Sequence, residues 1–143
     1  MKLRLAFLIV AGFWTMTVAG SSIQVEQATS VWDGVFTAEQ AKRGEAAYTE
    51  ACSSCHGADM AGDGFAPALA GSDFAGNWND LSVGDLFERI RISMPPTGPS
   101  AVPPQGKVDI VAHILDFNKY PTGSAELEPK TEVLKQIKIE LKK

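Results

Sequence analysis

The sequence predicts a small all-α protein, and three observations support this prediction. The chain has 143 residues, a length typical of a single domain. Three segments, 37–52, 82–94 and 106–118, carry apolar residues at the spacing of an amphipathic helix. A glycine-rich stretch without clear periodicity, 57–80, lies between the first two, and we expect it to be loop.

The first predicted helix begins after Thr37, whose hydroxyl can cap it. Gln40 stands three positions later and completes the capping-box pattern. The helix runs to Cys52, and the residues expected to face inward are Ala41, Ala47, Tyr48 and Ala51.

The second predicted helix is capped by Ser82, with Asp85 three positions on. Its apolar residues are Val83, Leu86, Phe87 and Ile90. The helix ends at Met94, because Pro95 and Pro96 cannot continue it and stiffen the backbone there.

The third predicted helix has an apolar stripe formed by Val108, Val111, Ala112 and Leu115. Asp109, His113 and Asp116 share the opposite face. We therefore interpret His113 as a solvated side chain among carboxylates.

Residues 1–20 have the pattern of a secretory signal peptide, since Lys2 and Arg4 precede an apolar run that ends in small residues. The run is short for a bilayer, which requires about 20 apolar residues, so cleavage is favoured over an uncleaved anchor. We expect an exported, periplasmic protein with no stable membrane span after cleavage. A flexible lead segment is predicted over residues 21–36.

Charge is unevenly distributed along the chain. The formal net charge is −4, and it becomes −6 when the two positive charges of the predicted signal are removed. Residues 130–143 carry +3 of this remaining charge, so residues 21–129 carry −9. An acidic body argues against nucleic acid as a partner. The folded domain is predicted over 37–120, and a charged C-terminal tail over 121–143.

The flanking segments contain apolar residues that either contact a partner or cover the domain: Trp32, Leu134, Ile137 and Leu141. The tail sequence "IKIEL" alternates, whereas positions 134, 137 and 141 suit a helix, so both conformations stay open. The domain alone is small and has a thin core.

Cys52 and Cys55 are the only cysteines, and His56 follows the second directly. A disulfide between them would restrain little of the unfolded chain. A redox pair is expected at a helix N-terminus, whereas this pair follows a helix. A zinc site would need four ligands, and the two histidines lack the paired spacing. Cys-x-x-Cys-His is instead the signature of covalent haem attachment.

A helical turn projects residues i, i+3 and i+4 to one side, so two thioether sulfurs and an iron-binding imidazole can reach one haem. A second axial ligand is then expected. Met60 is too close to His56 in sequence to reach the opposite haem face, and His113 is interpreted as solvated. Met94 is therefore the favoured ligand.

These motifs resemble those of class I c-type cytochromes over residues from about Thr37 to Asn118. The resemblance implies a small fold of helices and loops wrapped around one covalent haem c. It implies that Cys52 and Cys55 form the thioethers, and that His56 and Met94, the latter in "SMPP", ligate the iron.

Further positions carry roles by the same resemblance. In "FAPALAG", Pro67 resembles the proline whose carbonyl accepts a hydrogen bond from the ligand histidine, and Leu69 the leucine that lines the haem. Trp78 either donates its indole N–H to a haem propionate or packs beneath the haem edge. Gly44 and Tyr48 resemble the small-and-aromatic pair that lets the last helix cross the first closely.

A haem iron with both axial positions filled has no open site for oxygen or peroxide. The resemblance therefore implies a one-electron carrier and not an enzyme, cycling between Fe(III) and Fe(II) between a dehydrogenase and an oxidase or another cytochrome. Two alternatives stay open. One is a fixed electron-transfer subunit of a dehydrogenase complex, of the quinoprotein or sulfur-compound type. The other is a haem enzyme or sensor with a labile distal site.

Overall fold

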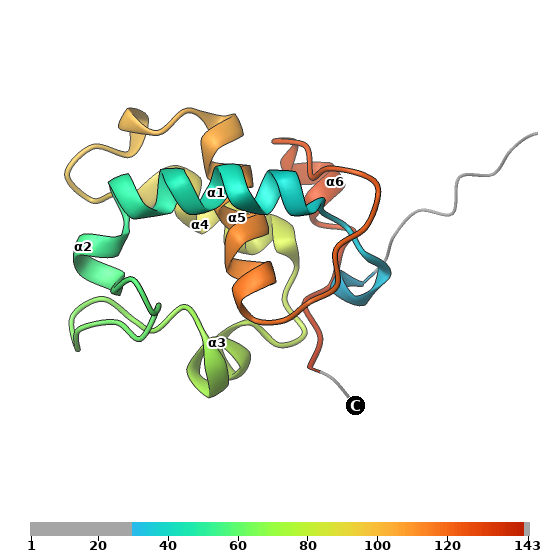
Figure 1. Cartoon of the computed structure of the whole chain (residues 1–143), viewed down its shortest axis with the longest axis horizontal. Coiled ribbons are helices and arrows are strands. Elements are labelled where there is room, and N and C mark those ends of the chain that lie inside the picture. The colour runs from blue at the N-terminus through green and yellow to red at the C-terminus, as the bar shows by residue number, and fades with distance from the viewer. Residues whose placement is uncertain (1–29, 142–143) are drawn as a thin grey trace, which may run out of the picture.

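The computed structural model describes residues 30–141 (Figure 1). The predicted signal peptide and residues 21–29 of the predicted lead lie outside this range. The described residues form helices and no β-strand, which confirms the predicted all-α fold. The elements are η1 (Val31–Asp33), α1 (Ala38–Ala51), α2 (Ser53–His56), α3 (Gly71–Trp78), α4 (Val83–Ser93), η2 (Pro99–Ala101), α5 (Pro104–Phe117) and α6 (Thr131–Leu134). None of the helices in this range is long and apolar enough to span a bilayer.

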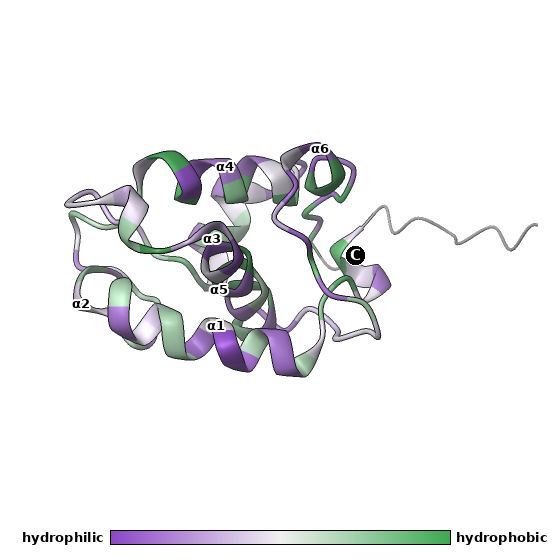
Figure 2. Ribbon diagram, turned by 90° about the horizontal axis from the view of Figure 1, so that it is seen from above, coloured by the Kyte–Doolittle hydropathy of each residue, from purple (hydrophilic) through white to green (hydrophobic). Residues whose placement is uncertain are grey.

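Helix α5 lies at the centre of the molecule, between α1 and α4 (Figure 2). α1 and α5 cross closely at Gly44, where an added Cβ would lie 1.8 Å from the carbonyl oxygen of Asp109. A glycine is therefore required at the crossing, as the sequence predicts. The rings of Tyr48 and His113 pack beside it, 5.4 Å apart.

The interpretation of His113 as a solvated side chain is wrong. His113 is half-buried against α1, and Asp109 on the same face is 5% exposed. The close crossing at Gly44 covers Asp109 and part of His113 on this face of α5, whereas Asp116 is exposed. Burial lowers the pKa of His113.

The two predicted N-caps are present, but only one forms a full capping box. Ser82 and Asp85 exchange the expected pair of hydrogen bonds at the start of α4. Thr37 Oγ1 accepts from the backbone N–H of Gln40, as expected. The amide of Gln40 instead turns inward, where it donates to Asp109 and both donates to and accepts from the backbone of Leu127. The Gln40 side chain, predicted to complete the cap at the start of α1, instead links α1 to α5 and to the tail.

The prediction that 57–80 is entirely loop is wrong, because residues Gly71–Trp78 form α3. This helix has no side-chain cap of its own. Its first residue is held from outside, since the backbone N–H of Gly71 donates to Asn118 at the end of α5. Phe74 is the buried residue of the helix.

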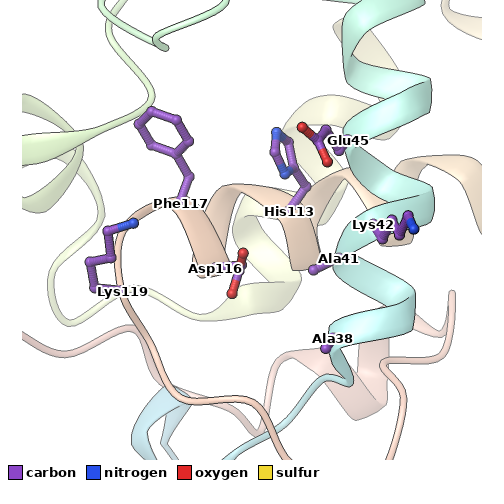
Figure 3. A pocket seen from close by; sticks show the side chains of 8 residues that line it. All are labelled: Ala38, Ala41, Lys42, Glu45, His113, Asp116, Phe117 and Lys119. Atoms are coloured by element: carbon purple, nitrogen blue, oxygen red, sulfur yellow. The ribbon is translucent and has the colours of Figure 1, made fainter.

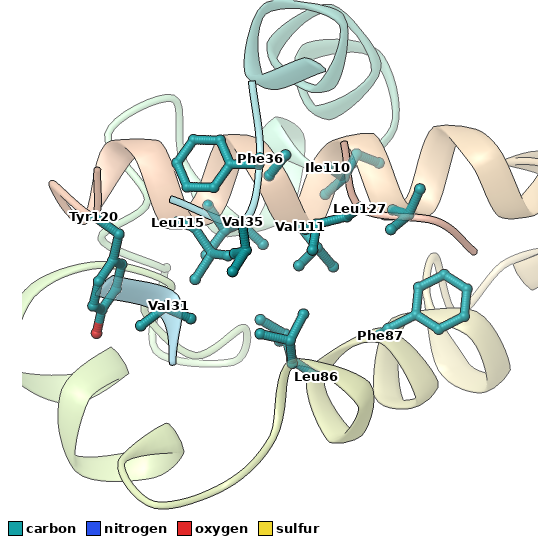
Figure 4. Packing of buried hydrophobic residues seen from close by; sticks show 14 of the residues in the cluster. Val31, Val35, Phe36, Leu86, Phe87, Ile110, Val111, Leu115, Tyr120 and Leu127 are labelled. Carbon is teal, nitrogen blue, oxygen red and sulfur yellow. The ribbon is translucent and has the colours of Figure 1, made fainter. Parts of the chain in front are cut away.

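Residues 30–36 of the predicted flexible lead pack into the core instead. Val31, Val35 and Phe36 are at most 5% exposed and meet side chains of α4 and α5 (Figure 4). Apolar residues at these positions form part of the core, so this part of the segment is fixed. Trp32 donates from Nε1 to the carbonyl of Glu140 and so joins the lead to the tail.

The described part of the tail covers the body. Leu127, Leu134, Ile137 and Ile139 are buried, whereas Leu141 is 47% exposed. The helical pattern holds only for α6, and residues 137–139 are extended and bonded through their backbones to the lead and to the segment before α4. Both conformations that the sequence left open are therefore present, one after the other.

Candidate functional site

The two cysteines and His56 lie on one tight turn at the end of α1. Cys52 caps α1 and begins α2, and its carbonyl accepts from the N–H groups of Cys55 and His56 at 3.1 and 3.0 Å. The two cysteines are not joined in a disulfide. Cys55 is exposed and Cys52 half-buried, and burial raises the pKa of the Cys52 thiol.

The imidazole of His56 is 8% exposed and fixed in one orientation. Its Nδ1 lies 2.9 Å from the carbonyl oxygen of Pro67, the contact that the resemblance implies. Because a carbonyl can only accept, Nδ1 carries the proton and Nε2 keeps its lone pair. The ring thus offers one free nitrogen of the kind that binds a metal.

The chain after His56 folds back to bring Pro67 to the imidazole. Gly62 has a positive φ of 74°, donates to the His56 carbonyl, and lies so close to Ala66 that an added Cβ would be 2.4 Å from its carbonyl oxygen. Asp63 Oδ1 accepts from the backbone N–H groups of Phe65 and Ala66. These local contacts shape a loop that begins and ends beside the His56 side chain.

Tyr48 supports the same turn from α1. Its hydroxyl donates to the carbonyl of Gly57 at 2.7 Å. Burial, with smaller contributions from Cys52 and Asp59, raises the pKa of Tyr48 to about 12. The phenol therefore stays protonated and keeps donating at any physiological pH.

Leu69 and Trp78 lie against the core but are only partly buried. The backbone around Leu69 is fixed from two directions, since its N–H donates to Met60 and its carbonyl accepts from Asn118. Asn118 is not predictable from sequence as a site residue, because nothing in its own segment indicates that it supports residues 69–71. A polar residue at the end of a predicted helical segment is the only signal available.

Met94 lies at the end of α4, as predicted, and its N–H donates to the Ile90 carbonyl. The Met94–Pro95 peptide is cis. The thioether is partly buried against the core and keeps an exposed portion. Met60, by contrast, is fully buried at 0% exposure.

The donor groups fit a covalently attached haem. Two free thiols, an imidazole nitrogen with a free lone pair and a thioether are the groups that attach a porphyrin and ligate its iron. Apolar side chains near the core are left partly exposed, among them Leu69, Ala70, Trp78, Met94 and Val102. A flat apolar cofactor is the kind of group that would complete such packing.

A hollow between α1 and α5 lies apart from these residues (Figure 3). It is lined by Ala38, Ala41, Lys42, Glu45, His113, Asp116, Phe117 and Lys119. Its charged lining consists of two lysines and two carboxylates, and none of the predicted haem residues lines it. We therefore do not place the functional site there.

Comparison with known proteins decides the family. A family model described as "Cytochrome C oxidase, cbb3-type, subunit III" matches residues 39–114, which is more than half of the chain. The chain belongs to this family of c-type cytochromes. No curated protein and no solved structure matches it.

The resemblance to class I c-type cytochromes is thereby confirmed. A c-type cytochrome domain binds haem c and transfers electrons. The matched stretch of this c-type cytochrome contains Cys52, Cys55, His56 and Met94. It leaves out the packed lead and the tail.

Proposed function

We propose that this c-type cytochrome is an exported one-electron carrier with a single haem c. Cys52 and Cys55 are the attachment sites, His56 is the proximal ligand and Met94 the distal ligand. The observation that carries this proposal is the hydrogen bond from His56 Nδ1 to the Pro67 carbonyl, because it leaves Nε2 free on a turn that also presents both thiols.

Haem c, when bound, supplies the Fe(III)/Fe(II) couple. The chain's own residues orient and shield it. The Pro67 carbonyl holds the proton of His56 Nδ1 and increases the basicity of the ring. The Met94 sulfur is a soft donor that favours the ferrous state and so raises the potential. Leu69 would line the cofactor, and Trp78 would either donate its indole N–H to a propionate or pack beneath the haem edge.

The partners we propose are a dehydrogenase as donor and an oxidase or another cytochrome as acceptor. The acidic body, with its −9 charge, would meet a basic surface on a transient partner. The electron-transfer rate should then fall as salt is added, because screening weakens steering between charged surfaces.

The test begins with the protein purified from its native host. Its intact mass should exceed that of the mature polypeptide by one haem, and its oxidised spectrum should show a sulfur-to-iron charge-transfer band. Met94→Ala should lose that band, and the matched variant Met60→Leu should keep it. A mass equal to the polypeptide alone contradicts the cofactor, and rapid cyanide binding by wild type contradicts the filled distal site.

A second candidate is a fixed subunit of a larger complex. The description of the matching family, subunit III of an oxidase, favours it. Phe65 and Ile92 are 100% and 61% exposed, as expected for side chains that become covered in an assembly. Purification under mild conditions distinguishes the two: a subunit elutes with larger chains at all salt concentrations, whereas a carrier elutes alone.

A further inference from the structure

Lys107, in the first turn of α5, is a buried cation with an unusual set of partners. It is 2% exposed, and its ammonium group donates to three backbone carbonyls: Ile90 at 3.2 Å, Arg91 at 2.9 Å and Pro99 at 2.6 Å. Within residues 30–141 no carboxylate forms an ion pair with it. Three donors thus meet three carbonyls, which satisfies a buried ammonium without an anion.

The three carbonyls flank the loop that carries Met94. Ile90 and Arg91 belong to the last turn of α4, where the negative end of the helix dipole attracts a cation. Pro99 begins η2 on the other side of the loop. One side chain from α5 therefore joins both ends of the segment 94–98.

The loop has few other means of being held. Pro95, Pro96 and Pro99 have no backbone N–H, so they cannot donate to a neighbouring element. The backbone hydrogen bonds of this segment are local: Met94 donates to Ile90, Gly98 donates to Pro95, and Ala101 donates to Gly98. The prolines offer no N–H groups that could hold the loop, and the ammonium of Lys107 instead donates to carbonyls on both sides of it.

Lys107 also connects the two sides of the haem site. α5 packs tightly on α1, and α1 ends at Cys52. The loop of Met94 is therefore fixed, through one residue, to the helix pair that carries the cysteines and His56.

We propose that Lys107 is a positioning residue that holds the loop of Met94 where its sulfur can reach the iron. This inference rests on the proposed ligation by Met94. A lysine suits the task, because its three donors rotate to meet carbonyls from two separate segments, whereas the arginine fork is planar.

The first test titrates the ferric holoprotein with imidazole, which competes with Met94 for the iron. Lys107→Met keeps the length of the side chain and removes all three donors. We expect imidazole to displace Met94 at least tenfold more readily in this variant. Hydrogen exchange of the amides in residues 94–102 should also rise at least tenfold.

The matched control separates positioning from general stability. Leu134→Ala opens a cavity under α6 and leaves the loop contacts intact. Its imidazole affinity should stay within twofold of wild type. The inference is overturned when Lys107→Met binds imidazole as wild type does, or when Leu134→Ala shows the same increase.

A second measurement needs no substitution at Lys107. Acetic anhydride should acylate Lys107 far more slowly than exposed Lys42 in the wild-type holoprotein. Coupling is reciprocal, so Met94→Ala should speed acylation of Lys107 relative to Lys42 at least fivefold. An unchanged ratio contradicts the inference. A wild-type protein without a sulfur-to-iron band contradicts the ligand assignment itself, so the two failures are distinguishable.

Discussion

The two ends of the molecule are built differently. α2 and α6 lie at opposite ends of the long axis (Figures 1 and 2). Near α6, tail, lead and helices bury their apolar side chains in one another, and the amide of Gln40 is satisfied by Asp109 and Leu127. In the segments that follow α2 in the chain, by contrast, Leu69, Trp78 and Met94 are only partly buried. The chain thus completes one end by itself and leaves the other to be completed by haem.

The largest effect on this comparison is expected when both haem attachment sites, Cys52 and Cys55, are removed. In Cys52→Ala/Cys55→Ala we expect no covalent haem and loss of amide protection over residues 53–80. Amides of α1 and α5 should keep part of their protection, because the buried lead and tail enlarge a core that is thin in residues 37–120 alone. Hydrogen exchange checks this.

The control for that experiment is Ser54→Ala, on the same turn, which should bind haem as wild type does. Equal loss of protection at both ends would contradict the comparison. It would mean that the lead and tail add too little core for the helix pair to persist without the cofactor.

The next largest effect is expected at the helix crossing. Gly44→Ala places a Cβ 1.8 Å from the Asp109 oxygen, so α1 and α5 must separate, and we expect a loss of about 3 kcal/mol in the free energy of unfolding. Gly76→Ala in α3, where an added Cβ meets nothing within 4 Å, should change stability by less than about 1 kcal/mol, toward stabilisation. Urea unfolding of both holoproteins measures the difference.

A comparable but smaller effect is expected in the tail. Leu134 is fully buried, so Leu134→Ala should cost about 2 kcal/mol, whereas Leu141→Ala, at a half-exposed position, should cost less than about 0.5 kcal/mol. A thermal unfolding series reports both. If neither substitution lowered the stability measurably, the tail would contribute little to the packed core.

The smallest expected effect is the contribution of Glu88, in α4, to the pH dependence of the free energy of unfolding. Its hydrogen bonds from Arg91 and Thr131 lower the pKa of the carboxyl from 4.5 to about 2. The unfolded chain takes up this proton near its ordinary value, so the stabilisation is complete above about pH 4.5 and is lost as the pH falls toward 2.

Glu88→Gln removes this contribution at neutral pH. The cost should stay below about 1 kcal/mol, because the pair with Arg91 is partly exposed. The variant should also lose less stability than wild type between pH 7 and pH 3. Glu50→Gln, on an exposed position of α1, serves as the control in the same urea titrations.

The features that sequence predicts well here are local. Thr37 and Ser82 cap their helices, the prolines after Met94 end α4, and the spacing of Cys52, Cys55 and His56 points to haem. Each of these signals lies within a few residues of the structure that it determines.

The features that sequence misses depend on distant partners. α3 has glycines at both Gly71 and Gly76 and no side-chain cap, so its first turn relies on Asn118 from α5. His113 appears polar and solvated until the crossing at Gly44 covers its face. From sequence alone, Lys107 would be predicted as an exposed charged residue, but carbonyls of α4 and η2 surround its ammonium group in the fold.

The meeting of lead and tail has a practical consequence for redesign of the chain. The backbone N–H of Val31 donates to Lys138 at 2.9 Å, so a short linker from Leu141 to Ser30 would span little distance. New ends could then be opened between exposed Ser124 and Ala125. Such a circular permutant should fold around haem as the natural order does, which would allow fusion partners to be attached at a different face.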